Sequence, residues 1–342
     1  MRKKNSSVNK VKKKNINLHI NSIYQVFETR IKRYVGKKDF SVGVSGGGDS
    51  LCLAFFSKIY QKKYGNKIYY FIVDHGLRKN SHEEAILVKK LLKKQNISSR
   101  ILKWEGKVPD RNVQSIARDI RYSLIDKNCK KYGIKFLLTA HHLDDQIETF
   151  FMRLIRGSGL VGLSSMSEKN NYKKIKIIRP FLSIKKRDLI KITGHIFKKY
   201  IKDPTNKNQK YFRTRIRMLI KLMEKEGLNF SKIVKTISNL SDSKQSLEFY
   251  IKIAIRKYVR NKKKVYFINK DIFSNEPNEI IFRVISQVFL NIGERNYPPR
   301  SKKILNLIRN IKSKNFKKST LSDCMITARD NFIVFKLNAA KS

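Results

Sequence analysis

Short apolar runs alternate with longer amphipathic segments through the first half of the chain. In the longer segments apolar residues recur every three or four positions, as on one face of a helix, whereas the short runs have the length of strands. This alternation is typical of an α/β fold in which helices cross over between parallel strands. The predicted strands are Phe40–Val44, Ile68–Val73, Arg100–Trp104, Ile134–Thr139 and, before Pro180, Ile175–Ile178.

Signals for helix starts and helix ends separate these strands. Gly65 is expected to stop the helix after the first strand, because glycine readily adopts the left-handed conformation that ends many helices. Ser81 and Glu84 have the spacing of a capping box, which predicts a helix start at that point. Two further helices are predicted, at Asn112–Lys131 and at Asp144–Arg156.

From about Gln209 onward the pattern is mostly helical and strongly basic, which indicates a second domain. Near the end, Cys324–Phe335 alternates around Arg329-Asp330-Asn331, as a β-hairpin does. A length of 342 residues also favours two domains. We predict a basic N-terminal tail and lead-in helix at 1–37, a parallel-sheet α/β catalytic domain at 38–208, and a smaller, mainly helical basic region at 209–342. The helices predicted there are Tyr211–Glu226, Phe230–Asn239 and Leu247–Arg260.

The chain has a formal net charge of +51, from 77 Lys and Arg against 26 Asp and Glu. A surface this basic attracts polyanions, so nucleic acid is the expected partner. A general richness in Lys, Ile and Asn, such as base-composition bias produces, is an alternative explanation for part of the excess.

Cysteine usage and hydropathy bear on the compartment. Cys52, Cys129 and Cys324 are widely separated and form no C-x-x-C pair, which argues against a disulfide framework, a zinc site or a cysteine-held cluster. We therefore expect a cytoplasmic protein. The longest apolar runs hold about six residues, far fewer than the roughly 20 that a membrane span requires. No membrane partner is expected.

A glycine-rich loop between the first strand and its helix is the candidate phosphate site. Three consecutive glycines let backbone amides approach an anion, and the helix that follows adds its positive end. The loop lacks the lysine of a Walker motif, and it is not a dinucleotide-binding G-x-G-x-x-G pattern. A glycine-rich turn without a ligand is the alternative. The candidate ATP-binding residues are Ser45, Gly46, Gly47, Gly48, Asp49 and Ser50, with Asp49 also the candidate ligand for Mg²⁺.

Two carboxylates at the start of a later helix form a second candidate cluster. Asp145 and Glu148 are three residues apart, so both project to one side of the helix. They can share a metal or orient an amine, although acids at a helix start also have a purely electrostatic role. His141 and His142 precede them without a third clustered ligand, so we assign no metal to the histidines.

Arginine pairs form the remaining candidates. Arg118 and Arg121 are three residues apart and reach a phosphate if their helix faces the same cleft. Arg213 and Arg217 share one helical face in the basic region, and the aromatic pair Tyr211-Phe212 before them suits stacking on unpaired bases. Exposed arginines and a solvated basic face are the alternative explanations.

The loop Ser45–Ser50 resembles the S-G-G-x-D-S signature of the PP-loop ATP pyrophosphatases, a superfamily that cleaves ATP to AMP and pyrophosphate. With further motifs in the same order, the chain resembles the tRNA(Ile)-lysidine synthetases within that superfamily. Thr205 and Thr214 depart from the family pattern, which has Ser and Asn there. The further motifs are Val73–Arg78, Ala117-Arg118 with Arg121-Tyr122, Thr139–Thr149, Arg156–Gly159, Asp203–Asn206 and Arg213–Arg217.

This resemblance implies a ligase that joins L-lysine to C2 of the wobble cytidine of a CAU-anticodon tRNA(Ile), through an adenylated cytidine. The phosphate loop would then hold pyrophosphate, with Asp49 binding magnesium and Arg118 stabilising charge on the transferred phosphate. Asp145 and Glu148 would bind or deprotonate the lysine amine. Contacts to substrate or tRNA are expected from Asp74, His75, Arg121, Arg213 and Arg217.

Other functions remain open at this point. A PP-loop tRNA thiolase, a small-molecule adenylating or amidating enzyme, and a non-catalytic RNA-binding protein are the alternatives. The sequence leaves the oligomeric state open, a homodimer included.

Overall fold

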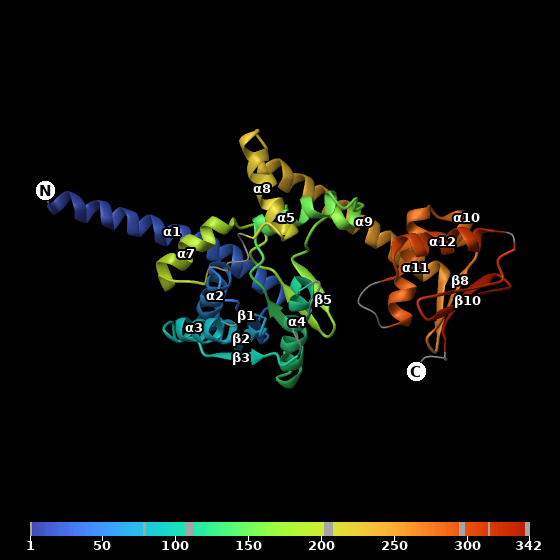
Figure 1. Cartoon of the computed structure of the whole chain (residues 1–342), viewed down its shortest axis with the longest axis horizontal. Helices are drawn as coiled ribbons and strands as arrows, with labels where there is room; N and C mark the ends of the chain where they lie inside the picture. The colour runs from blue at the N-terminus through green and yellow to red at the C-terminus, as the bar shows by residue number, and fades with distance from the viewer. Residues whose placement is uncertain are drawn as a thin grey trace. The chain divides into compact units, whose positions relative to one another are not determined.

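The computed structural model describes residues 2–77, 80–106, 113–201, 208–293, 298–313 and 315–338, of which 2–17 and 114 are described by backbone alone. By packing, the chain divides into two compact units, Met1–Ser238 and Asn239–Ser342 (Figure 1). The domain boundary at 208/209, which was drawn from the change to a mostly helical and basic pattern, stays a prediction.

A six-stranded sheet organises the first unit, in the order β3-β2-β1-β4-β6-β5. Every pairing is parallel except that between β5 and β6, so the predicted parallel α/β fold is confirmed. The polar strand β5 was missed because it has no apolar alternation. The strands are β1 (Phe40–Gly43), β2 (Ile68–Asp74), β3 (Ser99–Lys103), β4 (Phe136–Leu138), β5 (Lys169–Tyr172) and β6 (Ile175–Ile178).

Helices cover both faces of this sheet. One core joins α1, α2, α3 and α7 to one face, and a second core joins α4 to the other face. Figure 1 shows α2 and α3 on the opposite side of the strands from α4. The helices of this unit are α1 (Arg2–Tyr34), α2 (Gly48–Tyr64), α3 (Ser81–Lys93), α4 (Val113–Lys131), α5 (Leu143–Leu154), α6 (Leu160–Leu163), α7 (Lys186–Phe197) and α8 (Phe212–Lys225).

One predicted helix end and one predicted helix start had different outcomes. Helix α2 ends at Gly65, whose φ of 76° is left-handed, as predicted. The capping box at Ser81 and Glu84 is wrong, because α3 has Asn80 at its N-cap without a side-chain hydrogen bond. The Ser81 hydroxyl instead donates to Asp74 Oδ1 at 2.8 Å, so this serine ties the helix start to the end of β2.

The strand order places the phosphate loop at a switch point. From β1 the chain moves outward through β2 to β3, and then returns to β4 on the other side of β1. Ligands of open α/β sheets bind beyond the carboxyl ends of the strands where the order reverses. The glycine loop follows β1, and His141 and Asp145 follow β4, so both candidate clusters lie at this edge.

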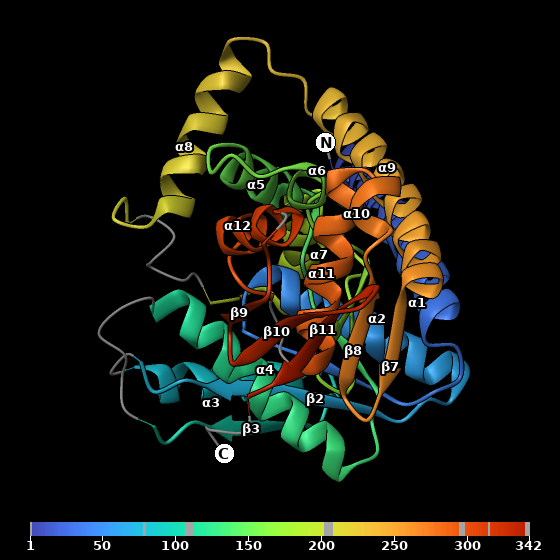
Figure 2. The ribbon, with the colours of Figure 1, turned by 90° about the vertical axis from the view of Figure 1, so that its right-hand side faces the viewer.

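The second unit combines helices with an antiparallel sheet, β7-β8-β11-β10-β9, whose strand order can be followed in Figure 2. The predicted hairpin is confirmed as β10 and β11, but three strands were missed and the two helices predicted between 230 and 260 form one, α9. The elements are α9 (Phe230–Tyr258), β7 (Val259–Lys262), β8 (Val265–Asn269), α10 (Ile272–Asn275), α11 (Asn278–Ile292), α12 (Ser301–Lys312), β9 (Lys318–Leu321), β10 (Cys324–Arg329) and β11 (Phe332–Leu337).

Among the residues that the model describes, no helix has the length and apolar character needed to cross a bilayer.

Candidate active site

The glycine loop is held by hydrogen bonds on both sides. Within it, the Ser50 hydroxyl donates to Gly47 O at 2.9 Å and accepts the Ser45 amide at 3.2 Å. From outside, the Ile201 amide donates to Gly46 O at 2.9 Å, and the Thr193 hydroxyl donates to the carbonyl of Gly48. The loop carbonyls are thus bound from behind, which leaves loop amides to face a ligand.

Gly46 and Gly48 are required by close packing. Gly46 has a φ of +86°, and a Cβ there would lie 2.4 Å from a methyl group of Val88. A Cβ on Gly48 would lie 2.4 Å from Ile190 Cδ1. Neither position accepts a side chain without movement of its neighbours, so the packing of the loop against α3 and α7 requires glycine at both.

The two predicted carboxylates lie together and are bound by two arginines of α8. Arg213 donates from Nε to Glu148 at 2.5 Å and from Nη2 to Asp145 at 2.5 Å. Arg217 Nε donates to the other oxygen of Glu148 at 2.6 Å. Asp145 and Glu148 are buried, so these bonds neutralise charges that water does not reach.

The carboxylate pair and the phosphate loop share one electrostatic environment. Burial alone would lower the pKa of the Arg213 guanidinium, but the charges of Asp145 and Glu148 raise it. The Asp49 carboxylate, in the first turn of α2, raises the same pKa further. The structure therefore joins Asp145 and Glu148 to Arg213 and Arg217 by hydrogen bonds, although the sequence proposed them as separate clusters. It also places Asp49 within electrostatic reach of Arg213.

His142 supports this arrangement. It is the N-cap of α5, where its Nδ1 accepts the Asp145 amide at 3.3 Å and its own amide donates to Asp145 Oδ2 at 3.1 Å. Burial would raise the pKa of Asp145, but the charges of His142 and Arg213 and the His142 amide hold it below its usual value. Asp145 is thus an anion with little tendency to accept a proton.

His141 lies beside the carboxylates, and sequence reasoning assigned it no role. Its Nδ1 is 2.9 Å from the Thr139 hydroxyl. Burial, aided by the charges of Arg179, Arg118 and Arg213 and opposed by Asp145, lowers the pKa of His141 to about 3. The imidazole is therefore neutral near pH 7 and can exchange hydrogen bonds but not supply a positive charge.

Arg118 and Arg121 are both exposed on α4. Arg118 lies over the ring of Tyr122, at 5.2 Å from its centroid. Its charge acts on His141, which places it within electrostatic reach of the cluster after β4.

Asp74 stabilises the loop after β2. Its carboxylate accepts hydrogen bonds from the Gly76 amide at 3.1 Å and the Ser81 hydroxyl at 2.8 Å, and lies 3.0 Å from His82 Nδ1. Burial would raise the pKa of Asp74, but these partners hold it low. His75 follows directly, at the same edge of the sheet. Arg78 and Asp203–Asn206 lie outside the described residues.

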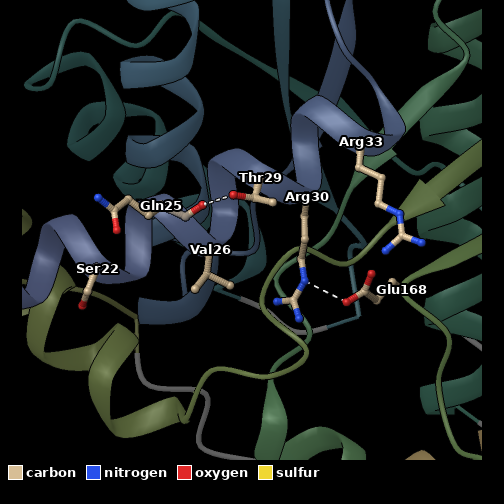
Figure 3. A pocket seen from close by; sticks show the side chains of 7 residues that line it. All are labelled: Ser22, Gln25, Val26, Thr29, Arg30, Arg33 and Glu168. Carbon is tan, nitrogen blue, oxygen red and sulfur yellow. Dashed lines mark hydrogen bonds and ion pairs between the residues drawn. The ribbon is translucent and has the colours of Figure 1, made fainter.

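A shallow depression on α1, of about 440 Å³, is separate from these clusters (Figure 3). Its Arg30 is paired with Glu168 at 2.7 Å and donates to Pro180 O at 2.8 Å. These contacts anchor α1, so we assign the depression no ligand. It is lined by Ser22, Gln25, Val26, Thr29, Arg30, Arg33 and Glu168.

Comparison with known proteins identifies the domain. Residues 16–223 match the family model described as a PP-loop domain. The tRNA(Ile)-lysidine synthase of Wolbachia pipientis wMel is 35% identical, over 84% of this chain and 67% of the relative. Its counterparts in Orientia tsutsugamushi and Rickettsia typhi are 32% and 31% identical, over 86% and 90% of this chain and 68% and 72% of theirs.

A solved structure supports the fold. The U34-tRNA thiolase NcsA from Methanococcus maripaludis aligns with a TM-score of 0.55 at 22% identity, covering 66% of this chain and 79% of that chain. At this identity the likeness concerns the fold alone.

Substitution of Gly46 by Ala should abolish ATP-dependent turnover and lower the free energy of unfolding by more than about 1 kcal/mol, because both its φ and Val88 oppose a side chain. Gly65→Ala is the matched control, since Gly65 also has a positive φ but has no atom near the added Cβ. Gly65→Ala should lower the free energy of unfolding by about 1 kcal/mol and leave turnover intact. Chemical denaturation and an ATP-consumption assay measure both effects; equal turnover in the two variants would contradict the crowding argument.

His141 should make stability depend on pH. Its pKa is lowered to about 3 in the folded protein, so the unfolded chain binds the proton more readily. The contribution of neutral His141 to the free energy of unfolding is complete above about pH 6.5, the ordinary pKa of histidine, and is lost as the pH falls toward 3. His141→Gln should flatten the acid side of the stability curve in this window, measured by denaturation at each pH. The exposed His195→Gln is the control, and an identical curve for both variants would refute the assignment.

Proposed function

Because the chain belongs to the tRNA(Ile)-lysidine synthase family, built on the PP-loop domain, we propose that it joins free lysine to C2 of the wobble cytidine in a CAU-anticodon tRNA(Ile). The enzyme is an ATP-using ligase that modifies tRNA. The observation that best supports lysine as the amine is the buried carboxylate pair Asp145 and Glu148 beside the phosphate loop.

The reaction has two steps. The C2 oxygen of cytidine attacks the α-phosphorus of ATP, and pyrophosphate leaves. The ε-amine of lysine then attacks C2, and AMP departs with the original C2 oxygen, while the amine proton passes to water or a nearby base. The first step needs groups that stabilise phosphate charge, and the second needs groups that orient an amine.

The glycine loop suits the first step. Its crowded glycines and the start of α2 supply amides and a positive helix end for pyrophosphate. Mg²⁺ fits here as well, because it is commonly bound by one or two carboxylates together with substrate phosphates. Asp49 would hold it, and the ion would offset charge on the leaving pyrophosphate. Arg118 would stabilise charge on the transferred phosphate.

The carboxylate cluster suits the second step. The lysine ammonium is attracted by buried anions, and the lowered pKa of Asp145 makes it a weak proton acceptor. Of the two roles considered for Asp145, binding is therefore favoured over deprotonation. Arg213 and Arg217 would hold both carboxylates in position. The negative charge of the carboxylates would then be shared between the two guanidinium groups and the ammonium.

The RNA and the compartment complete the proposal. The formal charge of +51 and the basic helix α8 suit the phosphate backbone of tRNA. Three free, buried cysteines agree with a reducing cytoplasm. Whether the enzyme works as a monomer or a homodimer is left to solution measurements.

Incubation of the protein with ATP, labelled lysine and a CAU-anticodon tRNA(Ile) tests the proposal. Label should enter the RNA in proportion to AMP released, and tRNA(Met), which has the same anticodon, serves as the specificity control. Release of AMP with sulfur rather than lysine incorporated would favour the thiolase alternative and overturn the proposal.

Glu148→Gln should raise KM for lysine about tenfold or more, since it removes one buried negative charge from the proposed ammonium site. Formation of adenylated tRNA, measured without lysine, should change far less. Asp144→Asn is the matched control, because Asp144 lies in the same helical turn but its Oδ2 accepts the Lys186 amide at 2.8 Å. An equal rise in KM for both variants would argue against a specific lysine site.

A further inference from the structure

We propose that Tyr122 is a positioning residue that holds the Arg118 guanidinium at the carboxyl edge of the sheet for the adenylation step. This inference rests on the proposed function, in which Arg118 stabilises charge on the transferred phosphate. It adds to the machinery a residue that the proposed function had not used.

Arg118 depends on Tyr122 for its position. Its side chain is exposed, and its guanidinium forms no hydrogen bond or salt bridge with the described part of the chain. The guanidinium lies over the face of the Tyr122 ring, 5.2 Å from the ring centroid. An exposed arginine samples many rotamers, so one that acts on a reacting phosphate gains from a fixed aromatic surface beneath it.

Tyr122 is itself held by packing. The residue is only 4% exposed, and its ring centroid lies 5.2 Å from that of Tyr172 in β5. The ring is therefore fixed between α4 and the edge strand of the sheet, and it offers Arg118 a surface that does not move.

Arg179 follows β6 directly, at the edge of the sheet where β4 delivers His141. It is 4% exposed, and its Nη1 donates to Ser167 O at 2.8 Å. Burial and the neighbouring charges of Arg118 and Arg153 lower the pKa of Arg179.

The charge of Arg179 is not balanced by an acid. Among the described residues no carboxylate pairs with Arg118, Arg153 or Arg179, in contrast to Arg213 and Arg217. A buried guanidinium without a carboxylate is costly. The arrangement is explained if an anion, here the transferred phosphate, completes the charge balance during the reaction.

The chain provides a matched control at the other end of the fold. Arg100 lies over the ring of Tyr132 at 5.5 Å and also donates to its hydroxyl at 2.5 Å. Arg100 is at the start of β3 and Tyr132 follows the end of α4, so the pair lies toward the amino edge of the sheet, away from the strand ends that carry the predicted site residues. Tyr132→Leu thus removes an arginine–tyrosine pair of the same kind without touching the proposed machinery.

A double-mutant cycle on the full-length enzyme tests the inference. Pyrophosphate release from ATP is measured in a single turnover with tRNA(Ile) and without lysine, for Tyr122→Leu, Arg118→Ala and the double variant. Tyr122→Leu should slow this step about tenfold while KM for ATP changes less than about threefold, and in the Arg118→Ala background it should have no further effect. Tyr132→Leu should leave the rate unchanged.

A conservative variant keeps the test independent of misfolding. Tyr122→Phe retains the ring and should recover most of the rate lost in Tyr122→Leu. Thermal melting of each variant shows whether the fold is intact.

Additive losses in the cycle would overturn the inference, because Tyr122 would then act independently of Arg118. A wild-type rate in Arg118→Ala would overturn both this inference and the role proposed for Arg118. Normal adenylation without lysine incorporation would count against the proposed function alone, and would leave the positioning of Arg118 supported by the cycle.

Discussion

Parallel pairing of β1 with both β2 and β4 is the constraint on which the site depends. Each parallel strand must be followed by a crossover, so the loop after β1 and the segment after β4 open at the same edge of the sheet. That edge receives the phosphate loop from one strand and His141 with the carboxylates from the next. Residues far apart in the sequence are thereby brought within electrostatic reach of one another, as Asp49 and Arg213 are.

Charge pairing then decides what each part of this edge can bind. Asp145 and Glu148 are buried, and buried carboxylates persist as anions only where donors offset the cost of desolvation. Arg213 and Arg217 supply that offset from α8, which ties a helix of the basic region to the catalytic sheet. Hydrogen bonds therefore join residues on the two sides of the boundary predicted at 208/209.

Much of this was predictable from the sequence, since parallel strands, crossover helices and the glycine turn follow from local patterns. The joining of Arg213 to Asp145 was not, because their contact depends on where α8 packs and no periodicity specifies that. The role of Ser81 was misassigned because its hydroxyl donates to Asp74, at the end of β2, and not to an amide of its own helix. The polar strand β5 carries no apolar alternation, so only its hairpin pairing with β6 defines it as a strand.

The same edge carries two kinds of charged group, and they suit the two chemical steps that we propose. Around the carboxylates, positive and negative groups are matched, so the proposed ammonium would meet anions that are already held in place. Around Tyr122, the arginines lack acid partners in the described residues, which suits the binding of a phosphate. His141 is neutral at pH 7, mainly because it is buried and in part because the charges of Arg179, Arg118 and Arg213 oppose its protonation. A neutral imidazole adds no positive charge that would compete with an ammonium for the carboxylates.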